Sequence, residues 1–182
     1  MKDNPSQSAS YLDYMMAPLA DDLRRQGSLH MGLLKLLHAR PDPVEISVLV
    51  QRLNATVQTT VLINLRGGAG TNYSAIKQLP PGTLLILLET ASAPLVGQSD
   101  QWLKVQDPAG SEGFVNAGFV AWLGGRSQSF TIDHLLNLLE FFSRAELVEI
   151  LPDKSSNQYL ARLNERGHYL ASFIAQQGIE KG

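Results

Sequence analysis

Two periods of hydrophobic residues divide the chain into three regions, of which the outer two are mostly helical and the middle one is rich in strands. Between Ser28 and His38 the apolar residues fall on one helical face, at Leu29, Leu33, Leu36 and Leu37. This spacing predicts a helix over 28–38 that ends before Pro41 and Pro43, because proline cannot donate a backbone hydrogen bond. A second short helix is expected over 47–54, with Ser47 as its N-cap.

The N-terminal segment combines a polar start with a helical period that contains a proline. Residues 10–25 include Tyr11, Met15, Leu19 and Leu23 at a spacing of four, but Pro18 lies within the run. We therefore expect a frayed tail over 1–10 that leads into a broken or bent helix.

The middle region, from Ala55 to Leu123, has a different pattern. Short runs of valine, isoleucine, leucine and threonine, such as VLINL, TLLILLE, WLKVQ and FVNAGFV, alternate with clusters of glycine, proline and asparagine. Five or so short strands at such close spacing predict a small barrel or sandwich.

The helical period returns after Gly124 and Gly125. A helix is predicted over 131–144, with Thr131 as its N-cap and one apolar stripe. A hairpin over 147–163 should turn within the polar run 152–157, and a last helix over 164–177 should begin at Asn164 and end at Gly178. The predicted fold class is α+β.

Composition narrows the class of protein. The 15 Lys and Arg residues against 17 Asp and Glu residues give a net charge of -2, so the chain has no general attraction for a nucleic-acid backbone. The absence of cysteine excludes disulfides, thiolate metal sites and cysteine nucleophiles. Because no apolar run has the length of a signal-peptide core or a membrane helix, we expect a soluble cytoplasmic protein without membrane insertion.

The middle region carries a series of short motifs in a fixed order. Residues 62–73 read LINLRGGAGTNY, and Ile76, Leu79 and Pro81-Gly82-Thr83 follow them. Further on stand Trp102-Leu103-Lys104-Val105 and Gly110-Ser111-Glu112-Gly113-Phe114-Val115, with an end near Phe119-Val120. In the order and spacing of these motifs, residues 55–123 resemble a bacterial-type SH3 domain. The resemblance implies a small β-barrel that binds without catalysis, frequently peptides or cell-wall material in exported proteins.

Aromatic residues are the candidates for ligand contact in such a module. Phe114 stands where the family often has tryptophan, and Phe119 where it has tyrosine, so two polar groups that could meet a ligand are absent. We expect Trp102 and Phe114 to fill the barrel core. The candidate ligand-binding residues, which lie beside loops or turns, are Tyr73, Asn72, Trp122 and Phe119.

The elements on either side of the barrel, taken in order, resemble a winged helix into which the barrel is inserted. The predicted organisation is an N-terminal tail and helix over 1–27, a mainly helical, winged-helix-like host over 28–54 plus 126–182, and an SH3-like β-barrel over 55–124. Insertion is sterically allowed because the two ends of a small domain usually lie close together.

A winged helix raises DNA binding as an alternative. Its candidate residues are Arg162, Arg166 and Lys154, together with the helix from Thr131. The outward positions of that helix include Asp133 and Glu140, which the phosphate backbone would repel, and no region of the chain has a basic surplus. We therefore do not expect DNA binding.

Patterns that carry catalysis are missing. The glycines of Gly67–Gly70 lack the Lys-Ser/Thr and the following helix of a phosphate-binding loop. The four histidines have no metal-ligand spacing, and we expect surface or capping roles for His30, His38, His134 and His168. We expect no enzyme activity, no metal and no cofactor.

The leading hypothesis is a non-enzymatic adaptor that presents an SH3-like module on a winged-helix-like scaffold to a protein or peptide partner. A DNA-binding transcriptional regulator and a cell-envelope module that binds peptides are the alternatives. The sequence leaves open whether the chain forms a homo-oligomer.

Overall fold

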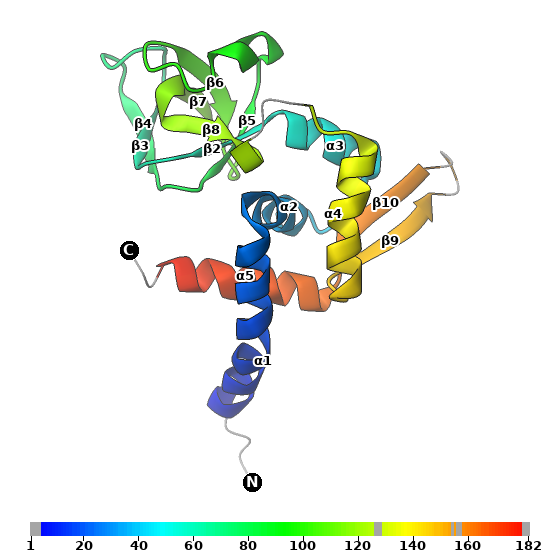
Figure 1. The fold of residues 1–182 in the computed structure, drawn as a ribbon. Helices are drawn as coiled ribbons and strands as arrows, with labels where there is room; N and C mark the ends of the chain where they lie inside the picture. Colours follow the sequence, from blue (N-terminus) through cyan, green and yellow to red (C-terminus); the bar gives the residue numbers. More distant parts are fainter. Residues whose placement is uncertain (1–4, 126–128, 154, 156–157, 180–182) are drawn as a thin grey trace. The chain divides into compact units, whose positions relative to one another are not determined.

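The computed structural model describes residues 5–125, 129–153, 155 and 158–179, and the chain forms two compact units (Figure 1). Unit 1 comprises residues 1–46 and 133–182, and unit 2 comprises residues 47–132. Unit 2 is thus inserted in the sequence of unit 1, whose two segments fold together.

Unit 1 is mostly helical. Its elements are α1 (Pro5–Gln26), α2 (Ser28–His38), β1 (Val44–Glu45), α4 (Ile132–Arg144, whose first residue is assigned to unit 2), β9 (Val148–Asp153), β10 (Gln158–Leu163) and α5 (Glu165–Ile179). The predicted bounds of α2 are confirmed, and the predicted hairpin is present as β9 and β10. The last helix, predicted over 164–177, spans Glu165–Ile179 and so continues past Gly178.

α1 is one continuous helix, so the predictions of a break at Pro18 and of a frayed tail as far as residue 10 were wrong. Pro18 lies inside α1 on its exposed side. The helix continues past this proline because Met16, Ala20 and Leu23 on the opposite side are buried, and α1 packs against α2 and α5. Apolar burial of this size outweighs the loss of one backbone hydrogen bond.

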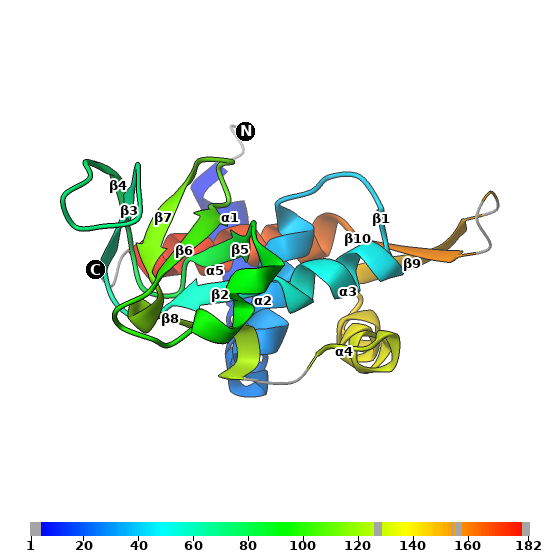
Figure 2. The same cartoon turned by 90° about the horizontal axis from the view of Figure 1, so that it is seen from above.

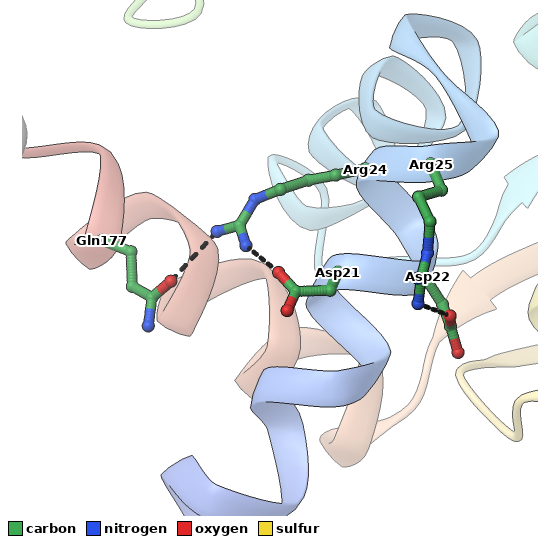
Figure 3. Close-up of polar contacts among 5 residues, drawn as sticks. All are labelled: Asp21, Asp22, Arg24, Arg25 and Gln177. Atoms are coloured by element: carbon green, nitrogen blue, oxygen red, sulfur yellow. Dashed lines mark hydrogen bonds and ion pairs between the residues drawn. The ribbon is translucent and has the colours of Figure 1, made fainter.

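The C-terminal end of α1 carries two ion pairs of its own and one hydrogen bond to α5. Arg24 donates to Asp21 at 2.7 Å and to the Gln177 side-chain oxygen at 3.1 Å, and Arg25 pairs with Asp22 (Figure 3). These residues are exposed or partly exposed, and exposed ion pairs contribute less than about 1 kcal/mol each. They therefore orient the helix end more than they stabilise it.

The end of α4 is built around a residue in the left-handed conformation. Glu146 has φ 54°, and the N–H of Leu147 donates to the Phe142 carbonyl at 2.9 Å, which is the helix-ending Schellman arrangement. Asn164 then starts α5: its Oδ1 accepts from the Gly167 N–H, and its Nδ2 donates to the Glu146 carbonyl. The predicted cap at Asn164 is confirmed, and it binds both helix ends.

β1, β10 and β9 form a three-stranded antiparallel sheet in that order. Val148 pairs with Leu163, and both are buried, as is Ala161 on the same side of β10, so the inner part of one sheet face is buried. The turn end of the hairpin points away from α5 (Figures 1 and 2). Towards this end, Ile150 and Tyr159 are exposed.

Unit 2 begins with α3 (Ile46–Asn54, whose first residue is assigned to unit 1), which starts one residue before the predicted N-cap Ser47. Its strands are β2 (Thr56–Thr59), β3 (Ile63–Arg66), β4 (Ala75–Leu79), β5 (Leu84–Leu87), β6 (Trp102–Gln106), β7 (Glu112–Asn116) and β8 (Val120–Trp122). Short turns of 3₁₀ helix lie at η1 (Thr90–Leu95), η2 (Ala117–Phe119) and η3 (Leu123–Gly125). Seven strands are thus described where five or so were predicted.

The strands of unit 2 form one sheet in the order β4-β3-β7-β6-β5-β2-β8. All seven strands contribute to a single apolar cluster, so the sheet must bend around it; the fully buried members include Val57, Leu65, Leu85, Leu103 and Val115. Within the described residues no strand pairing joins β4 to β8, so a closed barrel is not confirmed.

Candidate binding surface

The turn between β3 and β4 holds Tyr73 in a defined position. Two glycines make room for its ring: a Cβ on Gly68 would lie 2.5 Å from a Tyr73 ring carbon, and a Cβ on Gly70 would meet Asn72. Arg66 fixes the backbone of the turn by donating from Nη1 to the Tyr73 carbonyl at 2.7 Å. The Tyr73 side chain is 48% exposed, and Asn72 is exposed beside it.

Phe119 and Trp122 lie near the other end of the sheet order, in η2 and β8. Phe119 is 47% exposed, and its carbonyl accepts from the N–H and the hydroxyl of Thr60. Trp122 pairs with Val57 across β8 and β2 and packs against the apolar cluster while remaining partly exposed. The described contacts join Asn72 to Tyr73 through the glycine turn, but they do not bring either residue to Phe119 or Trp122.

Trp102 and Phe114 do not belong to the core, and the expectation that they fill it was wrong. Along β6 the buried residues are Leu103 and Val105, and along β7 they are Gly113 and Val115. Because side chains alternate across a strand, Trp102 and Phe114 face the outside of the sheet, where both are half-buried.

The outer side of the sheet brings aromatic and cationic side chains into one row. In the strand register, Arg66 of β3 is opposite Phe114 of β7, and Phe114 is opposite Lys104 of β6. Trp102 lies two residues before Lys104 on the same side of β6. Paired residues on one side of a sheet have Cβ atoms about 5 Å apart, so these side chains form a continuous surface. We call Arg66, Tyr73, Trp102, Lys104 and Phe114 the outer surface, because Arg66 also holds the Tyr73 turn.

The charges of the outer surface are partly uncompensated. Within the described part of the chain, the Lys104 ammonium group has no hydrogen-bond or ion-pair partner, and Arg66 is bound only to a carbonyl. Glu112 faces the same side two residues before Phe114. Two half-buried aromatic rings between available donors are the usual composition of a surface that binds protein segments.

Asp107 has a buried carboxylate in unit 2, but its contacts are those of a structural turn. Its Oδ1 accepts from the N–H groups of Ala109 and Ser111, and Lys77 pairs with it. Burial alone would raise the pKa of Asp107, but the hydrogen bond from Lys77, those from the backbone and the Lys77 charge together lower it below its ordinary value. The group is therefore held ionised at neutral pH.

The cations expected for DNA contact are largely neutralised. Arg162 pairs with Glu149 at 2.7 Å, and Arg166 pairs with Glu146 at 3.2 Å. Lys154 lies outside the described residues. On α4 the exposed residues include Ile132 and Leu136, at 51% and 43% exposure, which offer no hydrogen bonds to bases or phosphates.

In the residues that the structure describes, no three His, Asp or Glu side chains come together in a way that could hold a metal ion. No described helix is long and apolar enough to cross a membrane.

A comparison with known protein families gives a match that lies in the central part of the chain. The family description "Bacterial SH3 domain" matches residues 60–121, about a third of the chain, from the loop after β2 to β8. Nothing among the curated proteins matches, and neither does any solved structure. The match confirms the SH3 resemblance of this segment, a domain type that in general binds proteins or peptides, whereas no family match supports a winged helix in the flanks.

Proposed function

We propose that the chain is a non-enzymatic adaptor in which unit 2 binds a protein or peptide partner and unit 1 serves as a winged-helix-like scaffold in the cytoplasm. The observation that carries this proposal is the outer surface, where Trp102 and Phe114 remain half-buried beside Lys104, whose ammonium group has no partner among the described residues. Aromatic rings that are partly exposed leave apolar area in contact with water. A partner that covers these rings removes this area from water, which stabilises the complex. The match to the bacterial SH3 domain supports the same role.

The test is partner capture by the full chain, compared between matched variants. Lys104→Ala and Tyr73→Ala each remove part of the outer surface, and Tyr14→Ala in α1 serves as a control because Tyr14 is an exposed tyrosine of unit 1. A protein retained by the wild type and by Tyr14→Ala, but lost with Lys104→Ala, would then be purified and titrated against the chain. We expect at least a fivefold weaker Kd for Lys104→Ala. Equal affinity of all variants would move the binding site away from the outer surface.

Binding to DNA receives less support, because Arg162 and Arg166 are paired with carboxylates and the net charge is -2. We expect a Kd weaker than about 10 µM for random duplex at physiological salt, measured by fluorescence anisotropy. Tight binding that falls steeply with salt and is lost in an Arg162→Ala, Arg166→Ala double variant would favour a regulator instead. Retention of the chain on purified peptidoglycan would favour the cell-envelope alternative.

A further inference from the structure

Two histidines that are 130 residues apart in the sequence meet inside unit 1. His38 is the last residue of α2, and His168 lies in the first turn of α5. Their Nδ1 atoms are 3.0 Å apart and their ring centroids 5.2 Å apart, and both rings are half-buried. The expectation of separate surface or capping roles is therefore wrong for this pair.

Only one hydrogen atom fits between the two Nδ1 atoms. In the neutral pair, one ring carries its hydrogen on Nδ1 and donates, while the other carries it on Nε2 and accepts. A first added proton keeps a single N–H between the rings and turns the bond into a charge-assisted one. A second added proton would place N–H against N–H and two positive charges about 3 Å apart, so the contact would have to open.

We infer that His38 and His168 form a proton-sensitive latch between α2 and α5, closed while the pair holds at most one added proton and opened by the second. The latch is independent of the outer surface of unit 2.

The surroundings of the pair set the pH at which the latch acts. Burial lowers the pKa of His38, and the charge of His168 lowers it further. Lys35 lies one turn before His38 on α2, and Arg40 follows it by two residues. Within the described residues neither histidine has a carboxylate as a hydrogen-bond or ion-pair partner, so no acidic contact stabilises the doubly charged pair.

Other charges lie on the α5 side. The open pocket beside His168 is lined by Glu146, Glu149, Arg162, Glu165 and Arg166, among which Arg162 binds Glu149 and Arg166 binds Glu146. Glu165 precedes His168 by three residues. Asp13 of α1 accepts a hydrogen bond from the hydroxyl of Tyr169, the residue after His168. Arg162 and Arg166 are each paired with a carboxylate, which leaves Glu165 and Asp13 without a cation among these groups, and neither of these two carboxylates is bound to a histidine ring.

The direction of the pH effect follows from linkage. The pKa of His38 in the folded state lies below its value of about 6.5 in the unfolded chain, so the unfolded chain binds more protons in acid. The contribution of the His38–His168 contact to the stability of unit 1 is complete above about pH 6.5, and it is lost as the pH falls through the pKa of His38 in the folded state. Unit 1 should therefore loosen at mildly acidic pH.

The test compares His168→Asn with the wild type, because asparagine can keep a hydrogen bond to His38 but cannot be protonated. His134→Asn on α4 is the control, since His134 is exposed. Urea unfolding of the full chain is followed by circular dichroism at 222 nm, mainly a signal of unit 1, while both tryptophans report on unit 2. Between pH 7.5 and 5.0 the folding equilibrium constant of unit 1 should fall about tenfold more in the wild type and His134→Asn than in His168→Asn.

An equal loss in all three proteins would overturn the latch. If His168→Asn does not fold at pH 7.5, His38→Asn replaces it. NMR of the histidine ring nitrogens in the wild type gives a second answer: we expect opposite tautomers of His38 and His168 at pH 8 and two separated titration steps. Two independent titrations near pH 6.5 would refute the inference.

Discussion

Replacing the two neighbouring residues Trp102 and Leu103 by alanine tests the orientation of β6. Leu103 is fully buried in the apolar cluster of unit 2, whereas Trp102 is half-buried on the outer side of the sheet. The larger residue should therefore be the less important one for stability. This order is the reverse of what side-chain size alone predicts.

The magnitudes follow from burial. Leu103→Ala removes a fully buried side chain and leaves a cavity among leucines and valines, at a cost of about 3 kcal/mol. Trp102→Ala leaves no enclosed cavity, because water already reaches the ring, and it should cost about 1 kcal/mol. For a unit of this size, 1 kcal/mol changes Tm by about 4 to 8 °C, so Leu103→Ala should lower Tm by at least about 12 °C.

The assay is thermal and urea unfolding followed by tryptophan fluorescence, because both tryptophans lie in unit 2 and Trp122 remains in every variant. Leu103→Val is a milder control, expected to lie between the wild type and Leu103→Ala. A loss for Trp102→Ala equal to that for Leu103→Ala would refute the assignment of Trp102 to the outer surface.

Three further changes test the described contacts. Glu146→Gly should raise the stability of unit 1 by about 1 kcal/mol, since glycine accepts φ 54° without strain, and circular dichroism melting would show it; a lower Tm would mean that the pair with Arg166 matters more. Asn164→Ala should cost about 1 to 2 kcal/mol through loss of the α5 cap, measured in the same way, with the neighbouring exposed Glu165→Ala as a milder comparison. The lowered pKa of Asp107 predicts that its stabilisation of unit 2 is complete above about pH 4 and lost as the pH falls further. Asp107→Asn should make the stability of unit 2, measured by tryptophan fluorescence, less dependent on pH, and an unchanged slope would contradict this prediction.

Local signals predicted much of the fold, and contacts between distant residues account for the errors. The leucine spacing and Pro41 define α2, and Asn164 marks the start of α5 from its side-chain chemistry alone. The break predicted at Pro18 is absent because the helix is stabilised by the burial of Leu23, and this burial depends on the packing of α1 against α2 and α5. The His38–His168 contact leaves no local signal at all.

The candidate surface was only partly predictable. The partial exposure of Tyr73 could be predicted from the glycine turn beside it, which is visible in the sequence. Trp102 was misplaced because its size suggested burial, although the alternation of Leu103 and Val105 in the same strand already placed it on the other side. Strand register, which aligns Arg66, Phe114 and Lys104, is set by pairing across residues 66–114 and is not visible in any one segment.

The ends of unit 2 are joined by a pair of hydrogen bonds, in which the Asn54 side chain donates to the Phe130 carbonyl and accepts from the Phe130 N–H. A folded unit 2 therefore links the two segments of unit 1 as a short connection would, whereas an unfolded unit 2 links them by a flexible loop of about 80 residues. Closing the long loop would cost unit 1 roughly 2 kcal/mol more in chain entropy than closing a connection of a few residues. During synthesis unit 2 is complete before α4, the hairpin and α5 emerge, so its folding brings α2 within reach of the last segment. The order of the two units along the chain thus favours assembly from the inserted unit outwards, and a variant of Asn54 should slow the folding of unit 1.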